Sequence, residues 1–119
     1  MESELGSGST VLIVDDDEEI RHVLRIVCES GDMKVVGEAA TGVEAIPLAL
    51  QYQPKFVILD YRLPRLDGEG AAEIMRAVTP ESKIVAFSAL LDQQPPWADA
   101  FLNKDRITQL MPLLRSFIR

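Results

Sequence analysis

The stretch Phe56-Val57-Ile58-Leu59-Asp60 consists of four apolar residues followed by an aspartate. An uninterrupted apolar run of this length is typical of a strand buried on both faces of a sheet. Two further stretches have the same form and also end on charged side chains, namely Val11-Leu12-Ile13-Val14-Asp15-Asp16 and Ala100-Phe101-Leu102-Asn103-Lys104. If the three strands lie parallel in one sheet, their carboxyl ends bring three carboxylates and one ammonium group into one crevice, where open α/β sheets bind ligands.

Apolar periodicity predicts helices between these strands. A helical stripe begins after Asp15 and ends near Gly31, and Thr41-x-x-Glu44 is a capping box that opens a second helix. Asp67-Gly68 can begin a third helix, which should stop before Thr79-Pro80. The first stripe comprises Ile20, Val23, Leu24, Val27 and Cys28, and the remaining predicted elements are strands at Lys34–Glu38 and Lys83–Ser88 and a last helix at Ile107–Ile118.

Strand and helix alternate five times with short connections. This order predicts an α/β fold with a parallel sheet, helices on both faces and right-handed crossovers. Residues 1–9 are rich in Gly, Ser and Glu and are predicted to form a flexible lead-in, whereas residues 10–119 form one domain. Two adjacent prolines, Pro95 and Pro96, leave room for at most one or two helical turns after the fourth strand.

Composition excludes several classes of protein. The net charge of -7 argues against binding to nucleic acid, which needs clustered Lys and Arg. No apolar run approaches the roughly 18 residues that span a bilayer, and the acidic start does not resemble a signal peptide. We therefore expect a soluble, cytoplasmic domain that binds no membrane. The single cysteine, Cys28, cannot form an internal disulfide and is expected to be buried.

Asp15 and Asp16 predict a metal site. Adjacent carboxylates at the end of a buried strand repel each other unless a cation neutralises them. Mg²⁺ prefers oxygen ligands from a few carboxylates, waters and phosphates, so Asp16 and Asp60 are expected as direct ligands and Asp15 as a ligand through water.

Asp60 is then a carboxylate nucleophile that faces a metal, the arrangement that forms an aspartyl phosphate. Phosphoryl transfer depends mainly on positioning and charge neutralisation, which Mg²⁺ and Lys104 would supply from two sides. Ser88, at the end of the fourth strand, can donate a hydrogen bond to a phosphoryl oxygen, and the small Ala89 leaves access.

Four sequence elements together resemble the receiver domain of bacterial two-component response regulators. The Asp-x-x-x-Pro-x-x-Asp-Gly run that starts at Asp60 is the most specific, and it begins 44 positions after Asp16. The four elements are Val14-Asp15-Asp16, Leu59-Asp60-Tyr61-Arg62-Leu63-Pro64-Arg65-Leu66-Asp67-Gly68, Phe87-Ser88-Ala89 and Lys104.

The resemblance implies a flavodoxin-like three-layer sandwich of strand order 2-1-3-4-5. It also implies Mg²⁺-dependent phosphorylation of Asp60 by a histidine kinase or phosphotransfer protein, and no enzymatic activity beyond the domain's own phosphorylation and dephosphorylation. By the same resemblance the backbone carbonyl of Arg62 is a metal ligand, Ser88 is the switch hydroxyl and Phe101 is the aromatic switch residue.

The chain also departs from the family. Only 16 positions separate Ser88 from Lys104, fewer than in most receiver domains. The short spacing predicts a shortened or missing fourth helix. Asp105 follows the lysine instead of the usual proline, so a cis peptide is not assumed, and this form resembles regulators with LuxR-type DNA-binding outputs. Pro112 should kink the last helix. The sequence leaves open what the domain acts on. The possibilities are an output domain beyond Arg119, another target protein and a second copy in a homodimer.

Two alternatives to a phosphorylated switch stay open, and the altered fourth-helix region supports the first of them. The first is a receiver-like module that acts by dimerisation or partner docking without phosphorylation. The second is a Mg²⁺-dependent phosphatase, which Arg62 disfavours because such enzymes usually carry an aspartate at that position. Leu90 should order water poorly, so we expect slow hydrolysis of the phosphorylated aspartate. Trp97 could anchor a partner or cover the edge of the core, and His22 is expected at the surface.

Overall fold

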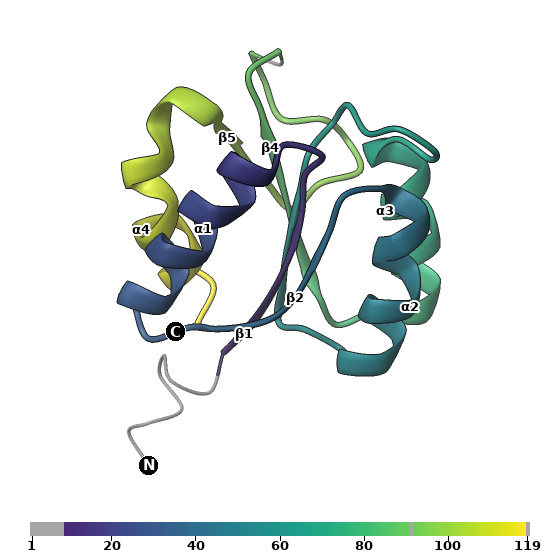
Figure 1. The fold of residues 1–119 in the computed structure, drawn as a ribbon, viewed down its shortest axis with the longest axis horizontal. Coiled ribbons are helices and arrows are strands. Elements are labelled where there is room, and N and C mark those ends of the chain that lie inside the picture. Colours follow the sequence, from purple (N-terminus) through teal and green to yellow (C-terminus); the bar gives the residue numbers. More distant parts are fainter. Residues whose placement is uncertain (1–8, 91, 119) are drawn as a thin grey trace.

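The computed structural model describes residues 9–90 and 92–118. Five parallel strands form one sheet in the order β2-β1-β3-β4-β5. Helices cover both faces, with α1 and α4 on one side and α2 and α3 on the other (Figure 1). The predicted fold class is therefore confirmed. The strands are β1 (Thr10–Val14), β2 (Lys34–Ala39), β3 (Phe56–Leu59), β4 (Lys83–Ser88) and β5 (Ala100–Asn103), and the α-helices are α1 (Glu18–Ser30), α2 (Gly42–Tyr52), α3 (Gly68–Val78) and α4 (Leu110–Arg115).

The central strands separate two apolar cores. Val11 and Ile13 of β1 face the core under α1 and α4, whereas Leu12 and Val14 face the core under α2 and α3. All four residues of β3 are buried. Continuous apolar runs mark these strands because both faces of the sheet are covered.

Side-chain caps begin the first three helices, and those at Thr41 and Asp67 lie where the sequence predicts a helix start. Asp17 accepts hydrogen bonds from the backbone of Glu19 and Ile20, and Asp67 accepts one from Gly70. Thr41 Oγ1 accepts from the backbone N–H of Glu44 at 3.0 Å. In return, the Glu44 carboxylate accepts from the N–H of Ala40, the residue before the cap, where the ideal capping box uses the N–H of Thr41.

The side chains of α1 agree only in part with the predicted apolar stripe. Leu24 and Cys28 are buried, but Val23 is 41% exposed, so its assignment to the stripe was wrong. The face of a helix that meets a sheet is narrower than the full set of apolar residues on it. Burial raises the pKa of the Cys28 thiol to about 12, and His22 is exposed as expected.

Among the described residues, no helix connects β4 to β5. The connection contains turns and bends instead, and the N–H of Ala98 donates to Pro95. The N–H of Asp99 donates to the Ile84 carbonyl at 2.8 Å, which returns the chain to the sheet. The expectation of a shortened or missing fourth helix is thus confirmed.

The prediction of a single helix over Ile107–Ile118 was wrong. A 3₁₀ helix, η2 (Lys104–Gln109), follows β5 directly, and α4 covers only Leu110–Arg115. Within η2, Arg106 has non-helical dihedral angles and marks a kink. Pro112 is the third residue of α4, where a backbone N–H has no partner inside the helix, so the α-helix can begin only shortly before it.

The N-terminal lead-in lies almost wholly outside the described residues. Ser9 is described, is buried, and accepts a hydrogen bond from the N–H of Lys34 at 2.9 Å. None of the helices within residues 9–90 and 92–118 is long and apolar enough to cross a membrane.

Candidate functional site

Asp60 lies directly after β3, at the carboxyl edge of the sheet. The pairing of Val14 with Leu59, and the hydrogen bond from Asp60 N–H to the Val14 carbonyl at 3.0 Å, place it beside Asp15. Gly68 closes the loop behind it through a 3.0 Å bond to the Tyr61 carbonyl. A Cβ on Gly68 would lie 2.6 Å from the Asp60 carbonyl oxygen, so only glycine allows this close approach.

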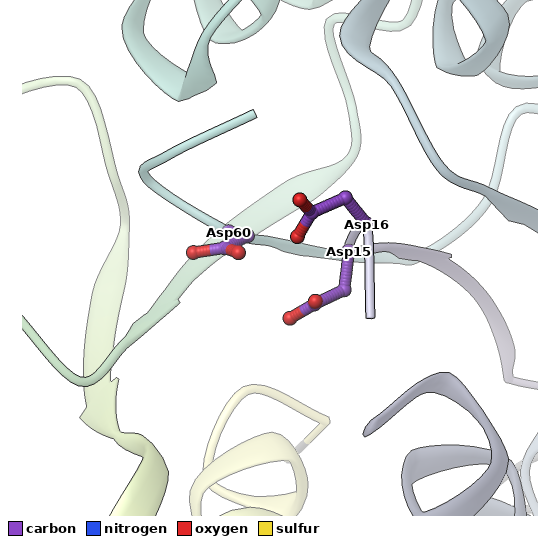
Figure 2. Close-up of side chains that lie close together, drawn as sticks. All are labelled: Asp15, Asp16 and Asp60. Atoms are coloured by element: carbon purple, nitrogen blue, oxygen red, sulfur yellow. The ribbon is translucent and has the colours of Figure 1, made fainter. Parts of the chain in front are cut away.

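The carboxylates of Asp15, Asp16 and Asp60 converge at this edge (Figure 2). Ligand oxygens from all three lie within 4.8 Å of one another, close enough to share a metal ion. Asp15 is buried and accepts a hydrogen bond from Asp17 N–H at 2.9 Å, whereas Asp16 is exposed to solvent. The arrangement combines two buried carboxylates with one that is accessible.

Lys104 is the cation nearest to this cluster. Its Nζ lies 2.8 Å from Asp15 Oδ2 and 3.3 Å from Asp60 Oδ2. Burial by itself lowers the pKa of Lys104, but the Asp15 and Asp60 carboxylates outweigh burial and the net shift is upward. The ammonium group also lies 5.8 Å from the centre of the Phe87 ring, within the range of a cation–π contact.

One lysine does not neutralise the cluster. Burial and the charge of Asp15 raise the pKa of Asp60 to about 6, against the opposing effects of Lys104 and of the Arg62 N–H. That N–H donates to Asp60 Oδ1 at 3.3 Å. A further cation at this position would remove the remaining repulsion between the carboxylates.

A pocket of about 480 Å³ opens above Asp60. Ser88 is buried in its wall, and its Oγ accepts the N–H of Leu90 at 3.0 Å, which leaves the hydroxyl hydrogen available to donate. Phe101 lies outside this pocket and lines a separate hollow of about 840 Å³ with residues of η2 and α4. The residues that line the pocket above Asp60 are Asp16, Asp60, Arg62, Leu63, Pro64, Ser88, Ala89, Leu90 and Lys104.

The predicted site residues therefore fall into two groups. Asp15, Asp16, Asp60, Ser88 and Lys104 meet at one edge of the sheet. Arg62 adjoins them through its N–H, while its role as a carbonyl ligand remains a prediction. Phe101 is half-buried on β5 and stands apart, so its role as a switch residue also remains a prediction.

A family model described as the response regulator receiver domain matches residues 11–104. The chain belongs to this family. A chemotaxis protein CheY of Listeria monocytogenes is 37% identical to this receiver domain over 84 residues, which are 70% of each protein. In four longer curated relatives the matched stretch covers only 19% to 40% of the relative's length.

Solved receiver structures share the fold. The response regulator domain of Thermotoga maritima CheB has a TM-score of 0.80 at 28% identity, with 93% of each chain covered. CheY in a CheX-CheY-BeF3-Mg complex from Borrelia burgdorferi has a TM-score of 0.82 at 25% identity, covering 93% of this chain and 90% of that one.

Two contacts of the receiver site are absent from the sequence-based prediction. Arg21 Nη1 donates to the Asp15 carbonyl at 2.7 Å, and the ring of Tyr61 stacks on that of Trp97. Trp97 also packs against the core beneath α2 and α3, which supports its role in covering the core edge. No spacing rule links Tyr61 to Trp97, but Arg21 lies in the second turn of α1, close enough to Asp15 to have been considered.

Proposed function

We propose that this receiver domain is a phosphoacceptor switch in which Asp60 takes a phosphoryl group from a phosphohistidine. The observation that carries the proposal is the Asp60 carboxylate, which opens onto the pocket with Lys104 Nζ 3.3 Å from one of its oxygens. A positioned carboxylate beside a cation provides both the nucleophile and the charge stabilisation that phosphoryl transfer needs.

In the proposed transfer, an oxygen of Asp60 attacks phosphorus while the phosphorus–nitrogen bond of phosphohistidine breaks. The imidazole leaves with the electron pair of that bond. Lys104 stabilises negative charge on the phosphoryl oxygens, and the Ser88 hydroxyl donates a hydrogen bond to one of them. Hydrolysis later breaks the aspartyl oxygen–phosphorus bond and releases phosphate, so the domain acts catalytically only on itself.

The donor set fits Mg²⁺. Oδ2 of Asp15 is buried and, among the described residues, accepts no hydrogen bond of good geometry, although Lys104 pairs with it. Asp16 and Asp60 would hold the ion directly, Asp15 through water, and the Arg62 carbonyl would complete the set by analogy with the family. When bound, Mg²⁺ neutralises the carboxylates and the charge that develops on the phosphoryl group.

The proposed partners follow from the family. The Borrelia burgdorferi structure joins a receiver to BeF3 and Mg²⁺, which supports the same ligand chemistry here. We propose a sensor histidine kinase or phosphotransfer protein as donor, in the cytoplasm. Ser88 and Phe101 are the proposed switch residues. Their targets would be another protein, a second copy or a LuxR-type DNA-binding domain outside this chain.

A receiver-like module that acts without phosphorylation is the second candidate. The observation that favours it is the connection between β4 and β5, in which the described residues form no helix. A surface that differs this much from other receivers could serve docking that does not depend on Asp60.

Intact-mass spectrometry after incubation with acetyl phosphate, with and without Mg²⁺, separates the two candidates. The switch predicts one phosphoryl adduct that needs Mg²⁺ and is absent from Asp60→Asn. Asp105→Asn is the matched control, because Asp105 is exposed beside Lys104 and outside the pocket, and it should keep the adduct. Absence of any adduct in the wild type would favour the docking module.

A further inference from the structure

Arg21 joins α1 to the loop that carries the acidic pair. Its Nη1 donates to the backbone carbonyl of Asp15 at 2.7 Å, and its Nε lies 3.3 Å from Oε1 of Glu38 on β2. Only 17% of the Arg21 side chain is exposed. Charge-assisted hydrogen bonds of this length are stronger than neutral ones, and partial burial limits competition from water.

Glu38 holds two arginines of α1, but only one of them reaches the site. Oε2 of Glu38 pairs with Arg25 Nε at 2.6 Å, and Arg25 also pairs with Glu29 at 3.0 Å. Among the hydrogen bonds of the described residues, Arg25 has none to the loop at Asp15. The two arginines therefore share a partner and a helix, but Arg21 also bonds to the Asp15 carbonyl and Arg25 instead pairs with Glu29.

The carbonyl that Arg21 holds belongs to the peptide unit between Asp15 and Asp16. The N–H of Asp15 itself, in the preceding peptide unit, donates to the Ala39 carbonyl of β2 at 3.0 Å. Because a peptide unit is planar, fixing its carbonyl also fixes the direction in which the chain enters Asp16. The position of the Asp16 carboxylate relative to Asp60 thus depends on the bond from Arg21.

We propose that Arg21 is a positioning residue that orients the Asp15–Asp16 peptide for Mg²⁺, with Glu38 orienting its guanidinium group. This inference rests on the proposed function, because it concerns the same metal site. Arg21 acts through the peptide and touches neither the ion nor the phosphoryl group.

Electrostatics and positioning predict opposite effects of removing Arg21. Loss of a positive charge near three carboxylates would by itself strengthen the binding of a cation. Loss of positioning weakens it, and partners that orient metal ligands typically contribute about 10-fold to 100-fold in affinity. The sign of the change therefore identifies the role.

Isothermal titration of the unphosphorylated protein with Mg²⁺ measures this sign. Arg21→Met should weaken Mg²⁺ binding by about 10-fold. Arg25→Met removes the same charge from the same Glu38 pair, and should leave affinity within about 2-fold of the wild type or strengthen it slightly. Arg21→Lys keeps the charge with fewer donors, and should fall between Arg21→Met and the wild type.

The outcomes separate this inference from the proposed function. If Arg21→Met binds Mg²⁺ as tightly as the wild type or more tightly, the positioning role is overturned and the proposed function is not. The same holds if Arg21→Met and Arg25→Met weaken Mg²⁺ binding equally. If Arg21→Met loses cooperative thermal unfolding, Arg21→Lys decides, and wild-type affinity in that variant overturns the proposal. If the wild type itself binds no Mg²⁺, the metal site of the proposed function fails and the inference fails with it.

Discussion

The ring of Tyr61 stacks on the ring of Trp97, with centroids 6.4 Å apart and planes inclined by 6°. Tyr61 directly follows Asp60, and Trp97 lies in the segment that connects β4 to β5. Arg76 of α3 holds that segment from the other side, by donating to the Trp97 carbonyl at 3.0 Å and pairing with Asp99. A side chain next to the proposed phosphoacceptor is thus in direct contact with the segment in which the described residues form no helix.

Trp97 should report occupancy of the site. It is the only tryptophan of the chain, so BeF3 with Mg²⁺ should change the intrinsic tryptophan emission of the wild type. Tyr61→Leu removes the stack and should reduce the change, because the ring that contacts Trp97 belongs to the residue directly after Asp60. Tyr52→Leu, which alters the other tyrosine on α2, is the control. An undiminished change in Tyr61→Leu would show that the stack does not carry the signal.

Ionisation of Asp60 should destabilise the metal-free fold. Its pKa is raised to about 6 in the folded state, so between about pH 4 and pH 6 the folded protein binds more protons than the unfolded chain. The contribution of Asp60 to the free energy of unfolding therefore falls as pH rises through this window. Asp60→Asn should be more stable than the wild type by about 3 kcal/mol above this window, and by less at pH 4. Urea unfolding in EDTA at several pH values measures this, and a constant difference across the window would contradict it.

Lys104 should stabilise the site most when metal is absent. Lys104→Met leaves Asp15 and Asp60 without their cation, and should lower the free energy of unfolding in EDTA by about 2 kcal/mol. Saturating Mg²⁺ should raise the thermal midpoint of this variant more than that of the wild type, since the ion takes over the neutralising charge. Lys83→Met, at an exposed position at the start of β4, should respond to Mg²⁺ as the wild type does. Equal Mg²⁺ responses in both variants would argue against this role.

The sheet and the acidic cluster could be predicted because both depend on local sequence. An apolar run such as Phe56–Leu59 identifies a strand buried on both faces, and the polar residue after it lies at the carboxyl edge by topology alone. Asp15 and Asp60 therefore lie on neighbouring strands, and the long side chain of Lys104 reaches both from the end of β5. The starts of α2 and α3 could be predicted for the same reason, since Thr41 and Asp67 cap their own helices.

The C-terminal segment could not be predicted in the same way. Apolar spacing across Ile107–Ile118 fits one helix, but the 3₁₀ geometry of η2 continues to Gln109 and α4 begins only at Leu110, shortly before the proline at position 112. The hydrogen bond from Arg21 to Asp15 and the stack of Tyr61 on Trp97 depend on how α1 and the β4–β5 connection pack. Sequence spacing brings Arg21 near Asp15 but does not orient its guanidinium group, and no spacing rule links Tyr61 to Trp97.

Leu90 should slow the loss of the phosphoryl group. Its side chain is 60% exposed and lines the pocket beside Ser88, where the hydrolytic water would approach. An apolar side chain cannot hydrogen-bond that water, so the phosphorylated wild type should persist for minutes or longer. Leu90→Gln supplies a donor and an acceptor at the same position, and should shorten the half-life several-fold. Leu50→Gln makes the same change at an exposed position on α2 and should have no effect. The measurement is the decay of the phosphoryl adduct by intact mass after removal of acetyl phosphate, and a half-life of seconds or less in the wild type would contradict the role of Leu90.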